Sequence, residues 1–551
     1  MIIKNIPYCA VKSLWIPAIL ISIAISLLYG QFLWNPVVFD DLYFFNGSIR
    51  SDYLGKIFSL NLRWLPYATF EWTHELLGLD LIWFHIGNMF IHIANSLLLF
   101  LFLRSLFGAV LDIGNGKGFS RASSARLSMT WTAFFAALIF SLHPVAVYAV
   151  AYLVQRSTLM ATFFVLLMLI LFLQGLIRGK TKYFVASAIA YFFAVHSKEH
   201  AIMAPALTLA LLFLICKPTK QLVRQIFPTF ILYGITAVFV FYQVKTSNIL
   251  GHAYEINAID MLSRLSSYSE FDTALAYPLS ILTQSWLFFK YIGIWIVPSA
   301  SSMSVDMVEN FATSFFSLPY TLSLIGFILY IAASIYLLLQ RGSKGLLGFA
   351  MLCPSLMFAT EFATVRIQES FVLYRSYLWM VCAFSAAPFL LQKLSARHSI
   401  WVLTFIAVLM VPMSWGRLTT FSHPFLLWDD AARLLTDKEM RPGVERIYHN
   451  RGIEFAQLKM YPEAILDYEK AISIYPEYSY AFNDRGASFF EIGKYPEALK
   501  DFERASELNP KYTRPYLGMA RTNEALGNQE AARKNYVELC TRGISLGCLK
   551  K

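Results

Sequence analysis

Residues 14–33 read LWIPAILISIAISLLYGQFL, and Phe39-Asp40-Asp41 follows shortly after this stretch. A predominantly apolar run of about 20 residues is long enough to cross the hydrocarbon core of a bilayer as a helix. Two adjacent carboxylates are costly to hold near hydrocarbon and usually mark a functional site. We therefore predict a membrane helix here, with the acidic pair at its edge as the leading candidate site.

The composition extends this prediction to the whole chain. Of 551 residues, 57% are hydrophobic and only 15% are charged. A soluble protein of this size could not bury so much apolar surface, so we expect an integral membrane protein in contact with lipids. The net charge of +11 is then interpreted through its distribution among loops, and no nucleic-acid partner is expected. Lys4 and Lys12 precede a first span too long for a signal peptide, which indicates a retained helix.

We predict an all-α fold with about 11 membrane spans. The expected spans are 14–33, 80–104, 129–151, 158–177, 183–197, 201–216, 227–245, 318–340, 346–362, 376–392 and 399–415. Segment 280–298 is apolar but contains Gln284 and Lys290, and we expect an interfacial or re-entrant helix there. Without that segment as a span, the basic loops fall on the side of the N-terminus, as the positive-inside rule requires. The N-terminus is then inside and the C-terminus outside.

This topology gathers most unusual polar residues on the outer face. A transporter would more often carry such residues near mid-membrane, so an outward-facing active site is favoured. The polar features concerned are the first outer loop 34–79 with Asp40 and Asp41, the turn at Gln155-Arg156, the corner 197–200, the large outer loop 246–317, and Arg366–Arg375.

The C-terminal region is a repeat array. Tyr448-His-Asn-Arg-Gly452 recurs 34 residues later as Phe482-Asn-Asp-Arg-Gly486, with small residues and aromatic residues in register. This period is typical of tetratricopeptide repeats, helix-turn-helix units that stack into a solenoid. We predict a membrane domain over 1–425 and a repeat domain over 426–551, with repeats at 445–478, 479–512 and 513–546.

The sequence leaves open whether the repeat domain binds a partner and whether its two cysteines form a disulfide. Such arrays bind peptides or proteins in a concave groove, but a short array can also simply pack on the membrane domain. Cys540 and Cys548 lie in its polar tail and are spaced for a short disulfide loop if the tail is in an oxidising compartment.

Histidines and cations around the membrane domain provide further candidates. His85 and His92 share one helical face with Asn88, and two histidines without a convincing third ligand favour helix–helix hydrogen bonding over a metal site. Arg156 is either a residue that snorkels to the interface or a clamp for a phosphate-bearing lipid. Separate clusters at Arg156, Lys198-Glu199 and Arg366–Arg375 favour an anionic substrate.

Taken in order, these motifs resemble a known family. The chain looks like the transmembrane-and-tetratricopeptide-repeat O-mannosyltransferases and their bacterial relatives, which are GT-C glycosyltransferases that use polyprenyl-phosphate sugars. The resemblance is densest over residues 35–205, and the segment around Arg366–Tyr377 looks more like the bacterial branch. The motifs are Phe39-Asp40-Asp41, Arg63-x-Leu-Pro, Phe84-His85-x-x-Asn88-x-x-x-His92, His143-Pro144 followed by Val150 and Gln155-Arg156, and Ser197-Lys198-Glu199, with the repeats after them.

The resemblance implies a GT-C-like helix bundle and a role for each residue. Asp40 would be the general base and Asp41 would orient the acceptor or a metal. Arg156, Lys198 and Arg375 would hold the donor phosphate. The cofactor stays open, with a divalent cation as the candidate. The residues implied to line the pocket are Arg63, His85, His92, His143, Glu199 and Glu369.

We therefore expect a bacterial inner-membrane glycosyltransferase with a periplasmic active site and periplasmic repeats. Its donor would be a sugar on a polyprenyl phosphate, and its acceptor a protein, pilin-like or otherwise secreted, presented through the repeats. Alternatives are transfer to a surface glycan or lipid, an oligosaccharide ligase with a pyrophosphate-linked donor, a membrane-anchored scaffold without enzymatic activity, and a transporter.

Overall fold

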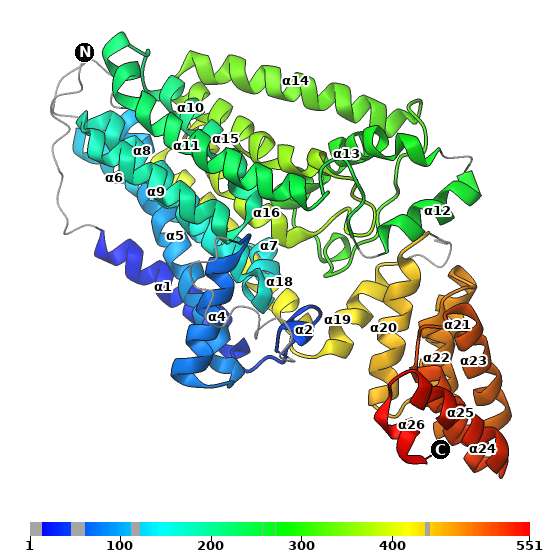
Figure 1. The fold of residues 1–551 in the computed structure, drawn as a ribbon. Coiled ribbons are helices and arrows are strands. Elements are labelled where there is room, and N and C mark those ends of the chain that lie inside the picture. Colours follow the sequence, from blue (N-terminus) through cyan, green and yellow to red (C-terminus); the bar gives the residue numbers. More distant parts are fainter. Residues whose placement is uncertain are drawn as a thin grey trace. The chain divides into compact units, whose positions relative to one another are not determined.

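The computed structural model describes residues 14–45, 61–111, 122–255, 257–269, 272–435 and 441–550, and within these ranges all regular elements are helical. Lys4 and Lys12, which precede the predicted first span, lie outside them. The chain divides into two compact units (Figure 1). The first, here the membrane unit, comprises 1–262, 269–303 and 311–423; the second, the repeat unit, comprises 263–268, 304–310 and 424–551. The repeat unit thus includes two short segments of the predicted loop 246–317.

The elements before residue 424 are mostly long helices. In chain order they are α1 (Trp15–Tyr29), η2 (Gly30–Phe32), α2 (Asp41–Phe45), α4 (Trp64–Leu77), α5 (Leu81–Leu111), α6 (Ala122–Leu142), α7 (Pro144–Val150), η3 (Leu153–Gln155), α8 (Arg156–Arg178), α9 (Thr181–Ser197), η4 (Glu199–Met203), α10 (Ala204–Ile215), α11 (Lys220–Thr246), α12 (Ala258–Ser269), η5 (Thr273–Leu275), α13 (Ala276–Ile296), η6 (Ala300–Ser302), α14 (Leu318–Gln340), α15 (Gly342–Phe358), η7 (Ala359–Ala363), α16 (Leu373–Met380), η8 (Val381–Ala386), α17 (Ala387–Leu390) and α18 (Ala396–Thr420).

Eight described segments are long and apolar enough to cross a membrane, or nine if the bent pair α6–α7 is one span. This fits a membrane protein. The predicted spans 183–197, 201–216 and 376–392 correspond to α9, to η4–α10 and to the broken run α16–η8–α17, which are shorter or interrupted helices. Segment 273–296, which contains α13, satisfies the same criterion of length and hydropathy. The number of crossings and the sidedness therefore remain predictions.

The predicted span 129–151 is broken at Pro144. Helices α6 and α7 meet there at a bend of 60°. A residue before proline is disfavoured in the helical conformation, and His143 is extended, with φ −72° and ψ 133°. Its ring nitrogen Nδ1 accepts a hydrogen bond from Val145 N–H, so the same residue ends one helix and caps the next.

The core of the membrane unit lies where α5 packs against α6 and α8. Leu99, Phe102, Leu103 and Leu106 on α5 are fully buried there. Helices α11, α14 and α18 differ from α5 in burial. Only 22% of the most apolar stretch of each is buried, and they expose many large aliphatic and aromatic side chains. Such surfaces suit contact with lipid tails.

The repeat unit contains the helices α19 (Pro424–Arg433), α20 (Val444–Gln457), α21 (Tyr461–Ile474), α22 (Ser479–Glu491), α23 (Tyr495–Leu508), α24 (Arg514–Ala525), α25 (Gln529–Thr541) and α26 (Ser545–Lys550). The pairs α20–α21, α22–α23 and α24–α25 each pack as one helix-turn-helix, in the three predicted repeats. Gly452 is needed at the first crossing, because an added Cβ would lie 2.7 Å from the Tyr468 ring.

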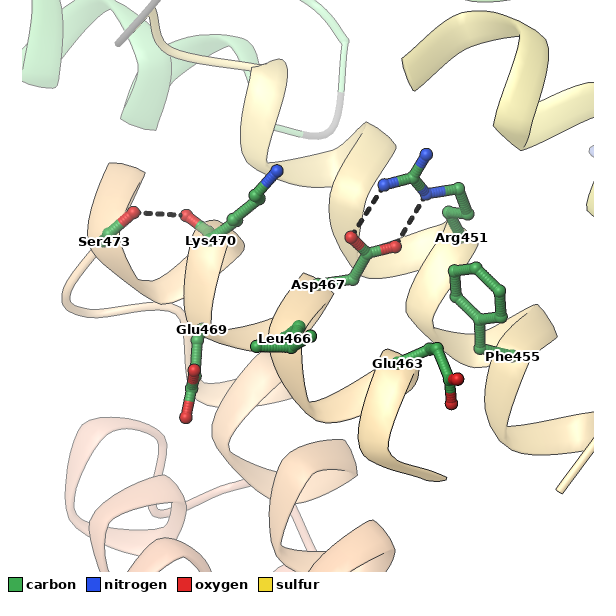
Figure 2. Close-up of a pocket in the computed structure, with 8 residues that line it drawn as sticks. All are labelled: Arg451, Phe455, Glu463, Leu466, Asp467, Glu469, Lys470 and Ser473. Carbon is green, nitrogen blue, oxygen red and sulfur yellow. Dashed lines mark hydrogen bonds and ion pairs between the residues drawn. The ribbon is translucent and has the colours of Figure 1, made fainter. Parts of the chain in front are cut away.

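An arginine–aspartate pair ties together the two helices of each of the first two repeats. Arg451 donates two hydrogen bonds to the Asp467 carboxylate, at 2.7 and 2.8 Å (Figure 2). Arg485 and Asp501 repeat this arrangement at 2.8 Å for both bonds. In the third pair Met519 stands at the arginine position and packs against Ala498 and Phe502 of α23.

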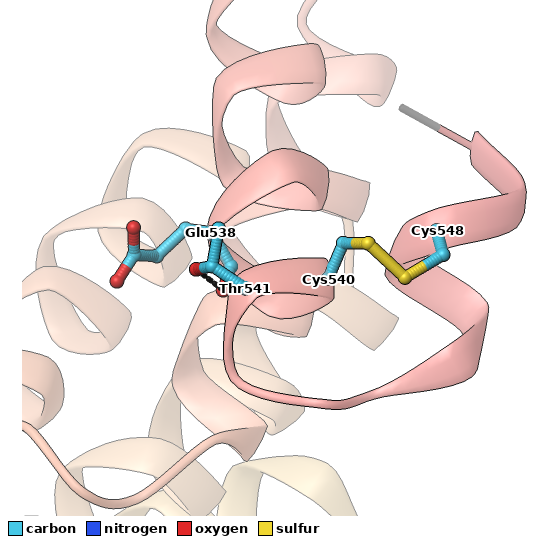
Figure 3. The surroundings of a disulfide bond; sticks show 4 residues. All are labelled: Glu538, Cys540, Thr541 and Cys548. Carbon is cyan, nitrogen blue, oxygen red and sulfur yellow. Dashed lines mark hydrogen bonds between the residues drawn. A yellow bond between two sulfur atoms is a disulfide. The ribbon is translucent and has the colours of Figure 1, made fainter.

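The array ends in a covalently closed turn. Cys540 on α25 and Cys548 on α26 form a disulfide, with their Cα atoms 4.6 Å apart (Figure 3). The bond closes the short loop between α25 and α26. The last helix of six residues is therefore held to the preceding repeat by more than its own packing.

Candidate functional site

The acidic pair lies at the start of α2, and its two members differ in environment. Asp41 is buried, and its carboxylate accepts hydrogen bonds from the N–H groups of Leu153 (3.1 Å) and Val154 (2.8 Å). Burial raises the pKa of Asp41 to about 8, although the N–H groups of Val154 and Leu153 act in the opposite direction. Asp41 thus carries a proton near neutral pH and anchors the first loop to η3.

Asp40 is exposed and meets a pair of tyrosines. Its backbone N–H donates to the Tyr152 hydroxyl at 3.2 Å, and its side chain also interacts with Tyr152. The Tyr152 ring lies edge-on to that of Tyr374, with centroids 6.0 Å apart. Lys198 places its ammonium 5.0 Å from the centre of the Tyr374 ring. We call Asp40, Tyr152, Tyr374 and Lys198 the Asp40–Lys198 cluster.

Lys198 is a buried cation held by neutral groups. Its Nζ donates to Gln155 Oε1 at 3.0 Å and to Thr158 Oγ1 at 2.7 Å. Among the described residues, no carboxylate oxygen forms an ion pair with this ammonium. Burial lowers the pKa of Lys198 well below its usual value, and the charges of Arg63 and Arg375 act in the same direction. An anion bound beside Lys198 would raise this pKa again and favour the charged ammonium.

A network of ion pairs joins several predicted site residues near Lys198. Arg63 contacts the Glu199 carboxylate with two nitrogens, the Nε–Oε2 distance being 2.9 Å. His200 lies between Glu199 (3.3 Å) and the buried Glu361 (3.1 Å). Burial alone would raise the pKa of Glu199, but the Arg63 guanidinium outweighs it and holds that pKa well below its usual value. Glu199 is therefore ionised and serves as a partner for Arg63.

Arg375 continues the network on α16. It donates to Glu361 Oε2 at 3.0 Å and to Glu369 Oε2 at 2.8 Å, and Arg366 lies 3.3 Å from the same Glu361 oxygen. The Tyr374 hydroxyl donates to Glu369 at 3.2 Å. Arg375 is thus neutralised by two carboxylates, and it positions Tyr374 of the Asp40–Lys198 cluster.

Arg156, predicted as a phosphate clamp, is almost completely buried and used within the fold. Its guanidinium donates to Asn88 Oδ1 and to the Phe84 carbonyl, both at 2.9 Å, and stacks 3.9 Å from the Phe70 ring centre. Gly87 makes room for it, since a Cβ there would lie 2.7 Å from the Arg156 Nη2 atom. These contacts bind α4, α5 and α8 together.

The three predicted pocket histidines each have a partner in another segment. His85 contacts the Asn35 carbonyl at 3.0 Å, and His143 contacts the Trp295 carbonyl at 3.1 Å. His92 contacts the Tyr377 hydroxyl at 2.7 Å and the Ser141 carbonyl at 3.0 Å. His92 and His143 thus hold helices to one another, and His85 ties α5 to the loop after η2.

The described residues contain no group of three or more His, Cys, Asp or Glu side chains arranged to hold a metal ion. The structure brings together Asp40, Lys198, Arg63, Glu199, Glu369 and Arg375. It adds Tyr152, Tyr374, His200 and Glu361, which sequence reasoning had not proposed because their positions in the sequence have no spacing signal.

The repeat unit carries a cavity along α20 and α21. It has a volume of about 520 Å³ (Figure 2). One of its cations, Arg451, is neutralised by Asp467 and by Asp429 on α19. Exposed charged side chains of both signs, among them Glu469 and Lys470, line the rest of the cavity.

The helix pairs of the repeat unit are similar to a known repeat family. Residues 445–478 and 479–512 match the tetratricopeptide repeat. No curated protein matches the chain. The tetratricopeptide repeats confirm the predicted array over these two units and indicate that the chain has a protein-interaction module, because stacked helix pairs of this kind present an extended binding surface.

Proposed function

We propose that the chain is a membrane glycosyltransferase that moves a sugar from a polyprenyl-phosphate donor to an acceptor at the periplasmic face of a bacterial inner membrane. The Asp40–Lys198 cluster carries this proposal. In the described part of the chain, an exposed carboxylate and a buried ammonium without a carboxylate partner lie at the two ends of one tyrosine pair. A base and an anion site in one cluster are what glycosyl transfer from a phosphate requires.

The reaction uses these two charges at opposite ends of the transferred sugar. Asp40 accepts the proton of the acceptor hydroxyl while that oxygen forms a bond to the anomeric carbon. The bond between the anomeric carbon and the donor phosphate oxygen breaks, and its electron pair remains on the phosphate. Lys198 stabilises the negative charge on this leaving group. Asp41 and Arg375 are positioning residues in this scheme.

The division of work between the two aspartates follows from their environments. Asp41 is buried, its carboxylate already accepts two backbone hydrogen bonds, and burial raises its pKa to about 8, so it is the less accessible of the two. Asp40 is exposed, so its carboxylate is open to an acceptor hydroxyl. The general base is therefore Asp40.

The acceptor is a protein bound by the repeats, of the pilin-like or otherwise secreted kind. The match to the tetratricopeptide repeat supports protein binding, and it equally supports a second candidate, a membrane-anchored scaffold without enzymatic activity. Transfer to a surface glycan or lipid remains the alternative acceptor class for the same active site.

Mass spectrometry of periplasmic and surface proteins tests the proposal. Cells lacking the chain are complemented with wild type, Asp40→Asn, or Glu75→Gln as a matched control on the exposed end of α4. We expect a sugar mass on at least one protein with wild type and Glu75→Gln, and its loss with Asp40→Asn at equal membrane abundance. Full function of Asp40→Asn would leave the scaffold as the function. A sugar missing only from glycan or lipid would change the acceptor class.

A further inference from the structure

Equivalent positions of the three repeats form a row on the first helix of each pair. Arg446 occupies this position in α20, Tyr480 in α22 and Arg514 in α24, at the 34-residue spacing of the matched repeats 445–478 and 479–512. First helices of successive stacked repeats lie beside each other. Their equivalent side chains therefore form a continuous strip.

The chain's own segment 304–310 shows what the first position of the strip binds. This segment belongs to the repeat unit, and its side chains Ser304, Asp306 and Val308 are buried, with a bend in the backbone at 305–306. The Asp306 carboxylate accepts two hydrogen bonds from Arg446, at 2.9 and 2.8 Å. Arg441 also donates to the Val308 carbonyl at 3.1 Å. A non-helical segment with an aspartate is thus bound to the arginine of the first repeat.

The third repeat offers the same position without such a segment. Arg514 and Arg521 are both exposed, and they share one face of α24 two turns apart. Within the described part of the chain neither forms an ion pair with a carboxylate. Tyr480, 46% exposed, lies between the first and third positions, and its ring is 4.8 Å from that of Tyr512. This part of the strip is basic, aromatic and open.

We propose that α24 binds an extended acidic segment of a protein partner, with Arg514 holding one carboxylate as Arg446 holds Asp306 and Arg521 holding a second. Two helical turns cover about 10 Å, which corresponds to carboxylates about two to four residues apart in an extended chain. Planar guanidinium groups bind carboxylates with two parallel hydrogen bonds, which gives both affinity and orientation. The inference deepens the proposed binding of an acceptor protein and does not depend on the transferase chemistry.

The test measures peptide binding to the full-length protein in detergent. The probe is a fluorescein-labelled decapeptide with the sequence of residues 301–310, SSMSVDMVEN, and fluorescence anisotropy is recorded as protein is titrated in. We expect Arg514→Gln to weaken binding about tenfold and the double variant Arg514→Gln/Arg521→Gln to weaken it further. Replacing the Asp and Glu of the probe by Asn and Gln should weaken binding to the wild type similarly.

The matched control is Arg533→Gln, which removes one exposed arginine from α25, the second helix of the same repeat. It should bind the probe as wild type does. The inference is overturned if wild type does not bind, if Arg514→Gln and Arg533→Gln bind equally, or if only Arg446→Gln weakens binding. Asp40→Asn should leave binding unchanged, so failure here is distinguishable from failure of the proposed transferase activity.

Discussion

The Asp41 carboxylate accepts a 2.8 Å hydrogen bond from the N–H of Val154, 113 positions further along the chain. This bond brings the loop after the first helix to η3, and it places the neighbouring Asp40 beside Tyr152. The geometry of the Asp40–Lys198 cluster therefore depends on a buried carboxyl, which is a positioning residue in the proposed reaction.

The pH dependence of stability should change when Asp41 cannot ionise. Its pKa of about 8 in the fold lies above the usual 3.8, so the folded protein binds this proton more tightly than the unfolded chain. Its contribution to stability is present below about pH 4 and is lost as the pH rises through about 8. Asp41→Asn should lose less Tm than wild type between pH 5 and pH 9 in detergent. An Asp40→Asn variant should follow wild type; identical curves for Asp41→Asn would contradict the assignment.

Arg156 should be required for folding. Arg156→Gln removes the donors from two buried acceptors on α5, and we expect a loss of about 1–3 kcal/mol for each acceptor left unsatisfied, seen as low membrane abundance and a large fall in Tm. Arg178→Gln, at the exposed end of α8, is the control and should stay near wild type. If Arg156→Gln folded normally but lost donor binding, the phosphate-clamp interpretation would be restored.

Replacing Lys198 should abolish sugar transfer without lowering the stability of the fold. Lys198→Met keeps the side-chain volume but removes a buried charge that has no carboxylate partner, so its Tm should match or exceed that of wild type. The sugar transfer followed by mass spectrometry should nevertheless be abolished. A variant that transfers sugar at the wild-type rate would exclude Lys198 from the site.

Glu361 should be the most sensitive carboxylate of the ion network. It faces Arg366, Arg375 and His200 while buried, so Glu361→Gln leaves two buried arginines with fewer partners, at a cost of about 3–5 kcal/mol. Glu369→Gln is the matched comparison, because its side chain is 28% exposed and water can replace the lost contact. Thermal unfolding of both variants measures the difference, and equal losses would argue against the network as described.

The disulfide provides a test of sidedness. Closing so short a loop stabilises the end of the array by about 2–3 kcal/mol in the chain-entropy account. If the repeats are periplasmic, Cys540 and Cys548 should resist a thiol-reactive maleimide in cells until a reductant is added. Thiols that are reactive without a reductant would place the repeats in the cytoplasm.

The sequence by itself determined the classes of structure present. Apolar runs such as 14–33 favour helices long enough to cross a membrane. Such a helix satisfies its own backbone hydrogen bonds while its apolar side chains face lipid. The period from Gly452 to Gly486 determined the helix pairs of the repeats, since one small residue at each crossing is a local steric requirement. The sequence also contains the reason for the bend in the expected span 129–151, because Pro144 disfavours the helical conformation at the residue before it.

Which charges are available for chemistry was decided only by the tertiary structure. Arg156, Lys198 and Arg375 were equivalent candidates in the sequence, yet folding buries the first against neutral acceptors and the Phe70 ring, places the last between two carboxylates and sets Lys198 beside the Tyr374 ring of the Asp40–Lys198 cluster. Asp40 and Asp41 are adjacent, but one is exposed and the other buried. Sequence spacing reports only local geometry, whereas burial and ion pairing depend on partners such as Glu361 and Tyr374 from distant segments, and these alone decide whether a charge is neutralised or free to act.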